Sequence, residues 1–138
     1  FLRHPSSVGA FWPSSKKLAS VMAANLPVWP GDLIVELGAG SGPVTERLHD
    51  YMQPSCAATY LGIERDPVLG KVLQERFPAM QFHVGDASDL PRVLGERGLP
   101  APKAIISGLP FGSMPAHVAR SMLAMIRDQL QPGGAATR

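Results

Sequence analysis

Cysteine and long apolar runs are scarce in this sequence, and acidic residues are missing before Asp32. Cys56 is the only cysteine, so no internal disulfide can form and a reducing compartment is expected. No apolar run approaches the roughly 20 residues that a membrane-spanning helix requires. Pro13 and the serines and lysines that follow it interrupt the only early apolar patch, so no secretory signal is expected. The histidines and the cysteine show no metal-ligand spacing, so no metal site is predicted.

The composition indicates a single α/β domain that begins with a basic segment. The 138 residues are 45% hydrophobic, which is ordinary for a globular core. The net charge of +2 and the isoelectric point near 9.0 do not by themselves indicate a polyanionic partner. Positive charge and aromatic side chains share residues 1–30, which include Arg3, Lys16, Lys17 and Trp12. We expect this segment to lie on an anionic membrane surface or on RNA, or its aromatic side chains to cap the core.

A short apolar run at residues 33–37 has the composition of a strand that is buried on both faces. Three glycines follow at alternate positions, Gly38, Gly40 and Gly42, and apolar residues then recur at helical spacing. Strand, glycine-rich turn and helix in this order predict a ligand-binding loop, because glycine tolerates positive φ and lets bare backbone approach a ligand. The glycine spacing differs from the dinucleotide fingerprint G-x-G-x-x-G. A tight turn without a ligand is the alternative.

Predicted strands and helices alternate along the rest of the chain. The order favours a Rossmann-like, doubly wound, mostly parallel α/β sheet over residues 31–138, with ligands bound at the carboxyl ends of its strands. The further strands are expected at 59–63, 80–84 and 103–107, and the helices at 43–52, 67–76, 90–97 and 115–131.

The pattern Glu36-x-Gly38-x-Gly40-x-Gly42 resembles the first motif of class I S-adenosylmethionine-dependent methyltransferases. The resemblance implies that the loop binds this cofactor, whose product form is S-adenosylhomocysteine. Glu36 lies inside the first strand, where a buried carboxylate needs donors or a cation. We expect it to hold the glycine-loop amides and to offset the positive charge of the sulfonium. The cofactor-binding loop residues are expected to be Gly38, Ala39, Gly40, Ser41 and Gly42.

Two further carboxylates follow the second and third predicted strands. Glu64 lies about 20 residues past the glycines, where a carboxylate can accept hydrogen bonds from both ribose hydroxyls; the alternative is a surface glutamate paired with Arg65. In methyltransferases that resemble this chain, an aspartate at the position of Asp86 accepts a hydrogen bond from the adenine amino group. The alternative for Asp86 is an N-cap of the turn at 87–89. Their neighbours Arg65, Gly85 and Ala87 are included in the predicted cofactor site.

The fourth strand leads into Ser107-Gly108-Leu109-Pro110, at the position of the catalytic motif of amino-group methyltransferases. Ribosomal RNA adenine dimethyltransferases carry Asn-Leu-Pro-Tyr or a close variant there, and the asparagine orients the target amine. Gly108 takes the place of that asparagine and has no side chain with which to recognise an adenine. This difference counts against RNA, and no nucleic-acid partner is expected.

Four stretches together resemble the bacterial phospholipid N-methyltransferases of the soluble type: residues 8–15, 36–45, 62–66 and 107–110. The resemblance implies stepwise N-methylation of phosphatidylethanolamine towards phosphatidylcholine, with a phospholipid substrate and an anionic membrane surface as partners. It also implies a cytoplasmic enzyme that is peripheral on the inner membrane.

The same resemblance suggests roles at the acceptor site. Ser107 and the backbone after it would hold the amine or the methionine end of the cofactor, and Gly108 would leave room for a quaternary ammonium. Phe111 and Trp12 are candidates for aromatic faces that favour this cation. No convincing general base is present, because His117, one helical turn after the motif, is more often structural in such a place.

The chain ends at Arg138, where methyltransferases of this fold continue with a fifth strand and an antiparallel pair. Four strands would leave the fourth with an unprotected edge, which favours association. We therefore expect a domain that is incomplete at its C-terminus or completed by a partner chain. Two alternatives to the lipid enzyme stay open: an rRNA adenine N6-dimethyltransferase, and a truncated cofactor-binding domain without catalytic activity.

Overall fold

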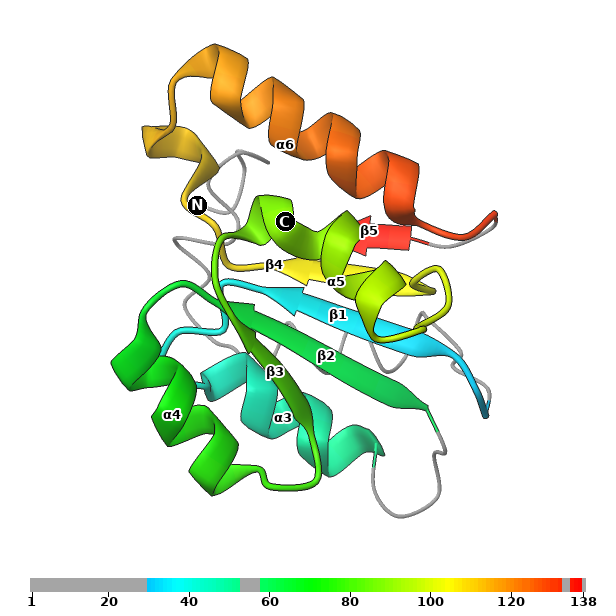
Figure 1. Cartoon of the computed structure of the whole chain (residues 1–138). Helices are drawn as coiled ribbons and strands as arrows, with labels where there is room; N and C mark the ends of the chain where they lie inside the picture. The colour runs from blue at the N-terminus through cyan, green and yellow to red at the C-terminus, as the bar shows by residue number, and fades with distance from the viewer. Residues whose placement is uncertain (1–29, 53–57, 133–134, 138) are drawn as a thin grey trace.

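The computed structural model describes residues 30–52, 58–132 and 135–137, and every structural statement below refers to this part of the chain. It contains one parallel sheet in the order β3-β2-β1-β4-β5, flanked by helices on both faces (Figure 1). The predicted Rossmann-like α/β fold is therefore confirmed. The strands are β1 (Leu33–Leu37), β2 (Thr59–Glu64), β3 (Gln81–Val84), β4 (Ala104–Ser107) and β5 (Ala135–Thr137).

The four α-helices lie where the periodicity predicts them, with ends that differ by no more than two residues. Short 3-10 helices at Ala87–Asp89 and Phe111–Ser113, directly after β3 and β4, were not predicted. Both occur where the chain turns at the carboxyl ends of the strands. The α-helices are α3 (Pro43–Met52), α4 (Pro67–Arg76), α5 (Leu90–Glu96) and α6 (Ala116–Gln129).

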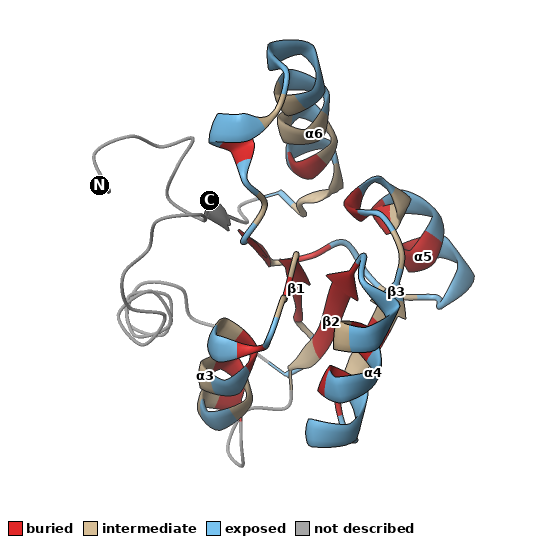
Figure 2. Cartoon of the chain, turned by 90° about the vertical axis from the view of Figure 1, so that its left-hand side faces the viewer, coloured by how far each residue is buried: buried red, intermediate tan, exposed pale blue. Residues whose placement is uncertain are grey.

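Two apolar clusters, one on each face of the sheet, stabilise this arrangement. All five residues of β1 are buried, and they alternate between the faces. Ile34 packs with residues of α3 and α4, whereas Leu33, Val35 and Leu37 pack with residues of α5 and α6. Figure 2 shows the buried central strands between the two helical layers. Because β1 is enclosed on both sides, the loop that follows it starts from a fixed point.

Helix α4 has a well-defined beginning, which matters because its other end reaches the glycine loop. The Asp66 side chain accepts hydrogen bonds from the backbone N–H groups of Val68 and Leu69 at 2.8 and 3.4 Å. Pro67 occupies the first helical position, where a missing N–H costs nothing. The helix therefore starts three residues after Glu64 and ends at Arg76.

The expectation of an unprotected fourth strand is wrong. Residues 135–137 form β5, which pairs in parallel with β4 in a register that joins Ala104 to Ala135 and Ile106 to Thr137. The turn after α6 returns the chain to the sheet within a few residues, so even a three-residue strand covers that edge. Strand β3 forms the other edge, and there Arg97 donates to the main-chain oxygen of Phe82 at 2.9 Å.

The order in which the strands are added to the sheet changes direction between β1 and β4, which is the topological switch point of the sheet. The chain passes from β1 outward to β2 and β3, and then crosses to β4 on the other side of β1. Open parallel sheets bind ligands at such a switch point, beyond the carboxyl ends of the strands. None of the helices in the described ranges has the length and apolar character needed to span a bilayer.

Candidate functional site

A cavity of about 490 Å³ lies at the carboxyl ends of the strands, beside the switch point. It brings together segments that follow all four of the predicted strands. Nine of the residues predicted from the sequence line it, and four more, Ile63, Met114, Val118 and Met122, were not predicted there. The nine are Gly38, Glu64, Arg65, Gly85, Asp86, Ala87, Gly108, Leu109 and Pro110.

The glycine loop requires its glycines for backbone reasons. Gly38, Gly40 and Gly42 have φ values of +74°, +61° and +98°, a region that other residues rarely adopt. The loop is tied to β2 at its start, because the Gly38 N–H donates to the Ile63 carbonyl at 2.8 Å. Only Gly38 of the five predicted loop residues lines the cavity. Ala39 is buried in the core instead, and the others shape the turn.

Glu64 is the side chain that joins the glycine loop to the end of β2. It is 7% exposed. One carboxylate oxygen accepts from the Gly40 N–H at 2.7 Å, and the other accepts from the Asp66 N–H at 2.9 Å. Each oxygen retains a lone pair, so the carboxylate can also accept hydroxyl groups from the cavity. Its pairing with backbone amides disagrees with the alternative of a surface glutamate bound to Arg65.

The expectation that Glu36 holds the glycine-loop amides is wrong, since the Gly40 amide goes to Glu64. One oxygen of Glu36 instead accepts from the Tyr60 hydroxyl at 2.6 Å and from the Thr45 hydroxyl at 2.7 Å. Its side chain points to the α3 face of the sheet, because positions along β1 alternate. Burial raises the pKa of Glu36, which disfavours the charge needed to offset a sulfonium. Glu36 thus anchors the first turn of α3 behind the loop.

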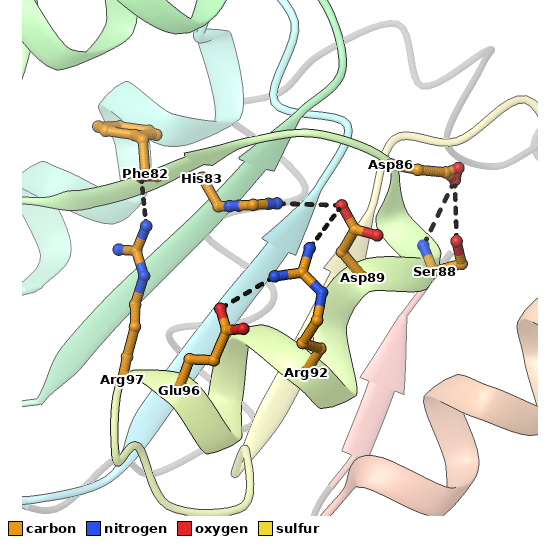
Figure 3. A network of polar contacts seen from close by, with 8 residues as sticks. All are labelled: Phe82, His83, Asp86, Ser88, Asp89, Arg92, Glu96 and Arg97. Carbon is orange, nitrogen blue, oxygen red and sulfur yellow. Dashed lines mark hydrogen bonds and ion pairs between the residues drawn. The ribbon is translucent and has the colours of Figure 1, made fainter.

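The turn after β3 carries Asp86 into the cavity and is braced from behind (Figure 3). His83 and Asp89 meet across it, with Nε2 and Oδ2 at 3.0 Å, and Arg92 reaches the same oxygen at 3.4 Å. The His83 hydrogen bond lowers the pKa of Asp89. One oxygen of Asp86 accepts from the Ser88 N–H at 3.4 Å and hydroxyl at 3.3 Å. Asp86 therefore caps this turn and lines the cavity, so its two predicted roles are compatible.

The turn that follows β4 approaches the glycine loop closely. A Cβ atom on Gly108 would lie 2.8 Å from the carbonyl oxygen of Gly38, closer than real Cβ contacts. The Gly108 N–H donates to the Leu37 carbonyl at 2.8 Å, which fixes this approach. Position 108 therefore requires glycine because the backbone of Gly38 occupies the space. The expected room for a quaternary ammonium is not on this side of Gly108.

Ser107 is only 1% exposed and does not line the cavity. Its hydroxyl oxygen accepts from the Leu109 N–H at 3.1 Å, which shapes the turn. This bond already uses the Leu109 amide that was expected to help hold the substrate. The residues of this turn that line the cavity are instead Gly108, Leu109 and Pro110.

The predicted aromatic partners of a cationic substrate are not assembled by the described residues. Phe111 is 3% exposed and packs in the cluster under α5 and α6, so its face is not available to the cavity. Trp12 lies outside the described residues. His117 is exposed on α6 and does not line the cavity.

An apolar wall of the cavity comes from the start of α6. Val118 and Met122 lie four residues apart and therefore share one side of α6, and Met114, two residues before the helix, lines the same cavity. Apolar residues at helical spacing, such as Val118 and Met122, ordinarily face the core. Met122 does pack on the core at its edge, but Val118 is 37% exposed. The sequence does contain a signal for this wall, because the apolar residues at spacing four begin at Met114, before the helix starts.

The arrangement can hold a nucleoside and bring a second molecule to the strand ends. Carboxylates from β2 and β3 face a cavity whose floor is bare glycine backbone and whose far wall is apolar. No group of three His, Cys, Asp or Glu side chains within residues 30–52, 58–132 and 135–137 could hold a metal ion. These features together define a class I S-adenosylmethionine-dependent methyltransferase, and the residues present suit that cofactor.

Comparison with known families agrees with this class. Residues 34–134 match the family model described as "Methyltransferase domain", and the chain belongs to this family. It is 35% identical over 137 residues to an ornithine lipid N-methyltransferase of Singulisphaera acidiphila, covering 97% of this chain and 70% of the relative. It is 32% identical over 106 residues to ribosomal RNA small subunit methyltransferase A of Parasynechococcus marenigrum, covering 75% of this chain and 33% of that protein.

Two solved structures with the same fold are methyltransferases. A TehB-like S-adenosylmethionine-dependent methyltransferase from Corynebacterium glutamicum superposes with a TM-score of 0.63 at 24% identity, over 88% of this chain and 60% of the other. A methyltransferase from Thiobacillus denitrificans in complex with S-adenosylhomocysteine gives 0.60 at 20% identity, over 88% and 47%. The chain thus spans about half of these two proteins.

Proposed function

We propose that this protein transfers methyl groups from S-adenosylmethionine to the primary amine of a membrane lipid headgroup. Phosphatidylethanolamine, converted stepwise towards phosphatidylcholine, is the acceptor that the sequence motifs favour. The relative with 35% identity is named for a lipid amine as well, and its alignment extends over 97% of this chain.

One observation carries the choice of a lipid amine over an adenine. Position 108 has no space for a side chain, because a Cβ there would lie 2.8 Å from the Gly38 oxygen. The rRNA adenine dimethyltransferases that this chain resembles use an asparagine at that place to orient the base. An aliphatic amine has no ring to be recognised and needs only a path to the methyl group. A backbone-lined approach at Gly108 and Leu109 suits such an acceptor.

The chemistry asks little of the protein beyond placement. When bound, S-adenosylmethionine supplies an electrophilic methyl group. Glu64 and Asp86 would hold the ribose and the adenine, and Gly38 would let the methionine end approach the backbone. The turn from Gly108 to Pro110 would then align the amine with the methyl group and exclude water, and both effects favour transfer.

A second acceptor is favoured by the name of the relative. An ornithine headgroup, like ethanolamine, presents a primary amine, and the relative is called an ornithine lipid N-methyltransferase. The same backbone-lined approach would accept either amine. The two acceptors differ in the mass of the lipid that gains methyl groups, so one lipid analysis separates them.

We further propose that the protein works as a peripheral protein on the cytoplasmic face of the inner membrane. The support is the basic and aromatic composition of residues 1–30, of which 1–29 lie outside the described residues. Binding to an anionic surface should weaken with salt, because it depends on exposed positive charge. Sedimentation with phosphatidylglycerol vesicles at low and high salt tests this expectation.

The test of the acceptor is expression in a host that lacks phosphatidylcholine but contains both phosphatidylethanolamine and ornithine lipid, followed by mass spectrometry of the lipid extract. Mono-, di- and trimethylated forms of phosphatidylethanolamine are expected to appear. The Glu64→Gln variant is the control, since it should produce less of each. An extract without any methylated headgroup amine would refute the lipid assignment, and methylated ornithine lipid alone would select the second acceptor.

A further inference from the structure

Arg76 contacts the glycine loop from behind, from the last turn of α4. Its Nη1 donates to the Ser41 carbonyl at 2.7 Å, although the two residues are far apart in sequence. Arg76 does not line the cavity, and its side chain is 41% exposed. Arg76 itself therefore belongs neither to the predicted cofactor site nor to the core.

Three polar groups of the loop are held by one structural unit. The Gly38 N–H binds the Ile63 carbonyl, the Gly40 N–H binds Glu64, and the Ser41 carbonyl binds Arg76. All three partners come from β2 and α4, which adjoin in sequence. The unit thus determines where the loop lies relative to the end of β2.

The Ser41–Gly42 peptide is fixed at both of its ends. Its carbonyl accepts from Arg76, and its N–H donates to the Ala39 carbonyl at 3.1 Å. Gly40 and Gly42 flank this segment with positive φ, and glycine backbone rotates with little steric resistance. Without the arginine, one side of the peptide loses its partner and the loop gains alternative orientations.

The guanidinium itself is held in place by its surroundings. Its Cζ lies 4.8 Å from the centre of the Phe77 ring, and its Nη2 lies 3.5 Å from Glu46 at the start of α3. A Cβ on Gly42 would lie 2.9 Å from Nη1, which shows how closely the arginine approaches the loop. A planar group with several donors suits this position better than a flexible ammonium.

We propose that Arg76 is a positioning residue for S-adenosylmethionine, which it affects by fixing the Ser41–Gly42 peptide of the glycine loop. The proposal rests on the cofactor assignment and not on the identity of the methyl acceptor. Without this donor the free loop has more conformational entropy, and ordering it on binding costs more free energy. The affinity for the cofactor therefore falls, while the chemical step in the saturated enzyme is unchanged.

The test measures the Kd of S-adenosylhomocysteine by calorimetry in Arg76→Met, Arg76→Lys and Glu46→Gln, with Tm recorded for each. Arg76→Met should raise the Kd about tenfold, which corresponds to an added ordering cost of about 1.4 kcal/mol when the loop is fixed on binding. Arg76→Lys keeps a positively charged donor, but not the planar geometry, and should recover part of the affinity. Glu46→Gln removes the ion pair but leaves the Ser41 contact, so its Kd should match that of the wild type.

Kinetics provide the second readout. In Arg76→Met the KM for S-adenosylmethionine should rise with the Kd, and kcat should stay within about twofold. An unchanged Kd in Arg76→Met would overturn the proposal, because the Ser41 contact would then not affect cofactor binding. An equal loss of affinity in Glu46→Gln would also overturn it, because the effect would then come from the ion pair or from helix stability. If the wild type itself bound no S-adenosylhomocysteine, the cofactor assignment would fail, and this proposal with it.

Discussion

The contact between Gly108 and Gly38 gives the sharpest test of how the site is built. Alanine at position 108 would place a Cβ 2.8 Å from the Gly38 carbonyl oxygen, with backbone on both sides. Neither partner is the flexible end of a side chain, so the two turns must move apart. Such overpacking typically costs about 1–3 kcal/mol. For a domain of this size, that corresponds to a fall in Tm of roughly 3–10 °C.

The same movement should appear in cofactor binding. Both turns line the cavity, so separating them displaces the end of β4 from the floor of the glycine loop. We expect Gly108→Ala to weaken S-adenosylhomocysteine binding by about tenfold, which corresponds to a loss of about 1.4 kcal/mol of binding free energy. Differential scanning calorimetry and isothermal titration calorimetry measure the two effects.

Gly95→Ala is the matched control. Gly95 lies in α5, and a Cβ there would meet nothing within 4 Å. Alanine in a helix interior should stabilise the protein by roughly 0.4–1 kcal/mol. Wild-type stability and wild-type affinity in Gly108→Ala would refute the reasoning, because the two backbones could then not be in contact.

Three other substitutions test the carboxyl groups. Glu64→Gln puts an amide where two backbone N–H groups donate, and should weaken S-adenosylhomocysteine binding about tenfold or more in calorimetry; unchanged affinity would contradict the ribose assignment. Asp86→Ala should discriminate less against a cofactor analogue that lacks the adenine amino group, and equal discrimination would argue against that contact. For Glu36→Gln the pH dependence is informative: burial raises the pKa of Glu36, so the native state binds this proton more tightly than the unfolded chain. The stability of wild type relative to Glu36→Gln should therefore fall as pH rises through the raised pKa, and a constant Tm difference between pH 4 and 8 would exclude this linkage.

Local patterns in the sequence were sufficient for most of the fold. Apolar residues at 33–37 and the glycines after them predicted β1 and its turn, because burial on both faces and positive φ each restrict the residue types. The carboxylates at strand ends were predictable in the same way, since parallel strands bring their carboxyl ends to one edge. Glu64 and Asp86 accordingly line the same cavity.

Contacts between distant segments were not predictable from local patterns. Glu36 and Glu64 are both carboxylates on the same face of the sheet, near the loop. Only the path of the loop decides that the Gly40 N–H donates to Glu64, whereas Glu36 accepts from the hydroxyl of Tyr60. Phe111 looked available because it follows the motif, yet the short 3-10 helix turns it into the core. The bond between Arg76 and Ser41 depends on where α4 ends in space.

The most direct test of the central claim is a reconstituted methyl-transfer assay. The purified protein would receive radiolabelled S-adenosylmethionine together with vesicles that contain phosphatidylethanolamine, vesicles of phosphatidylcholine alone, or unmethylated small-subunit ribosomal RNA. The account predicts label in the lipid extract of the phosphatidylethanolamine vesicles and in neither of the other samples. Label in the RNA, with none in the lipid, would contradict it.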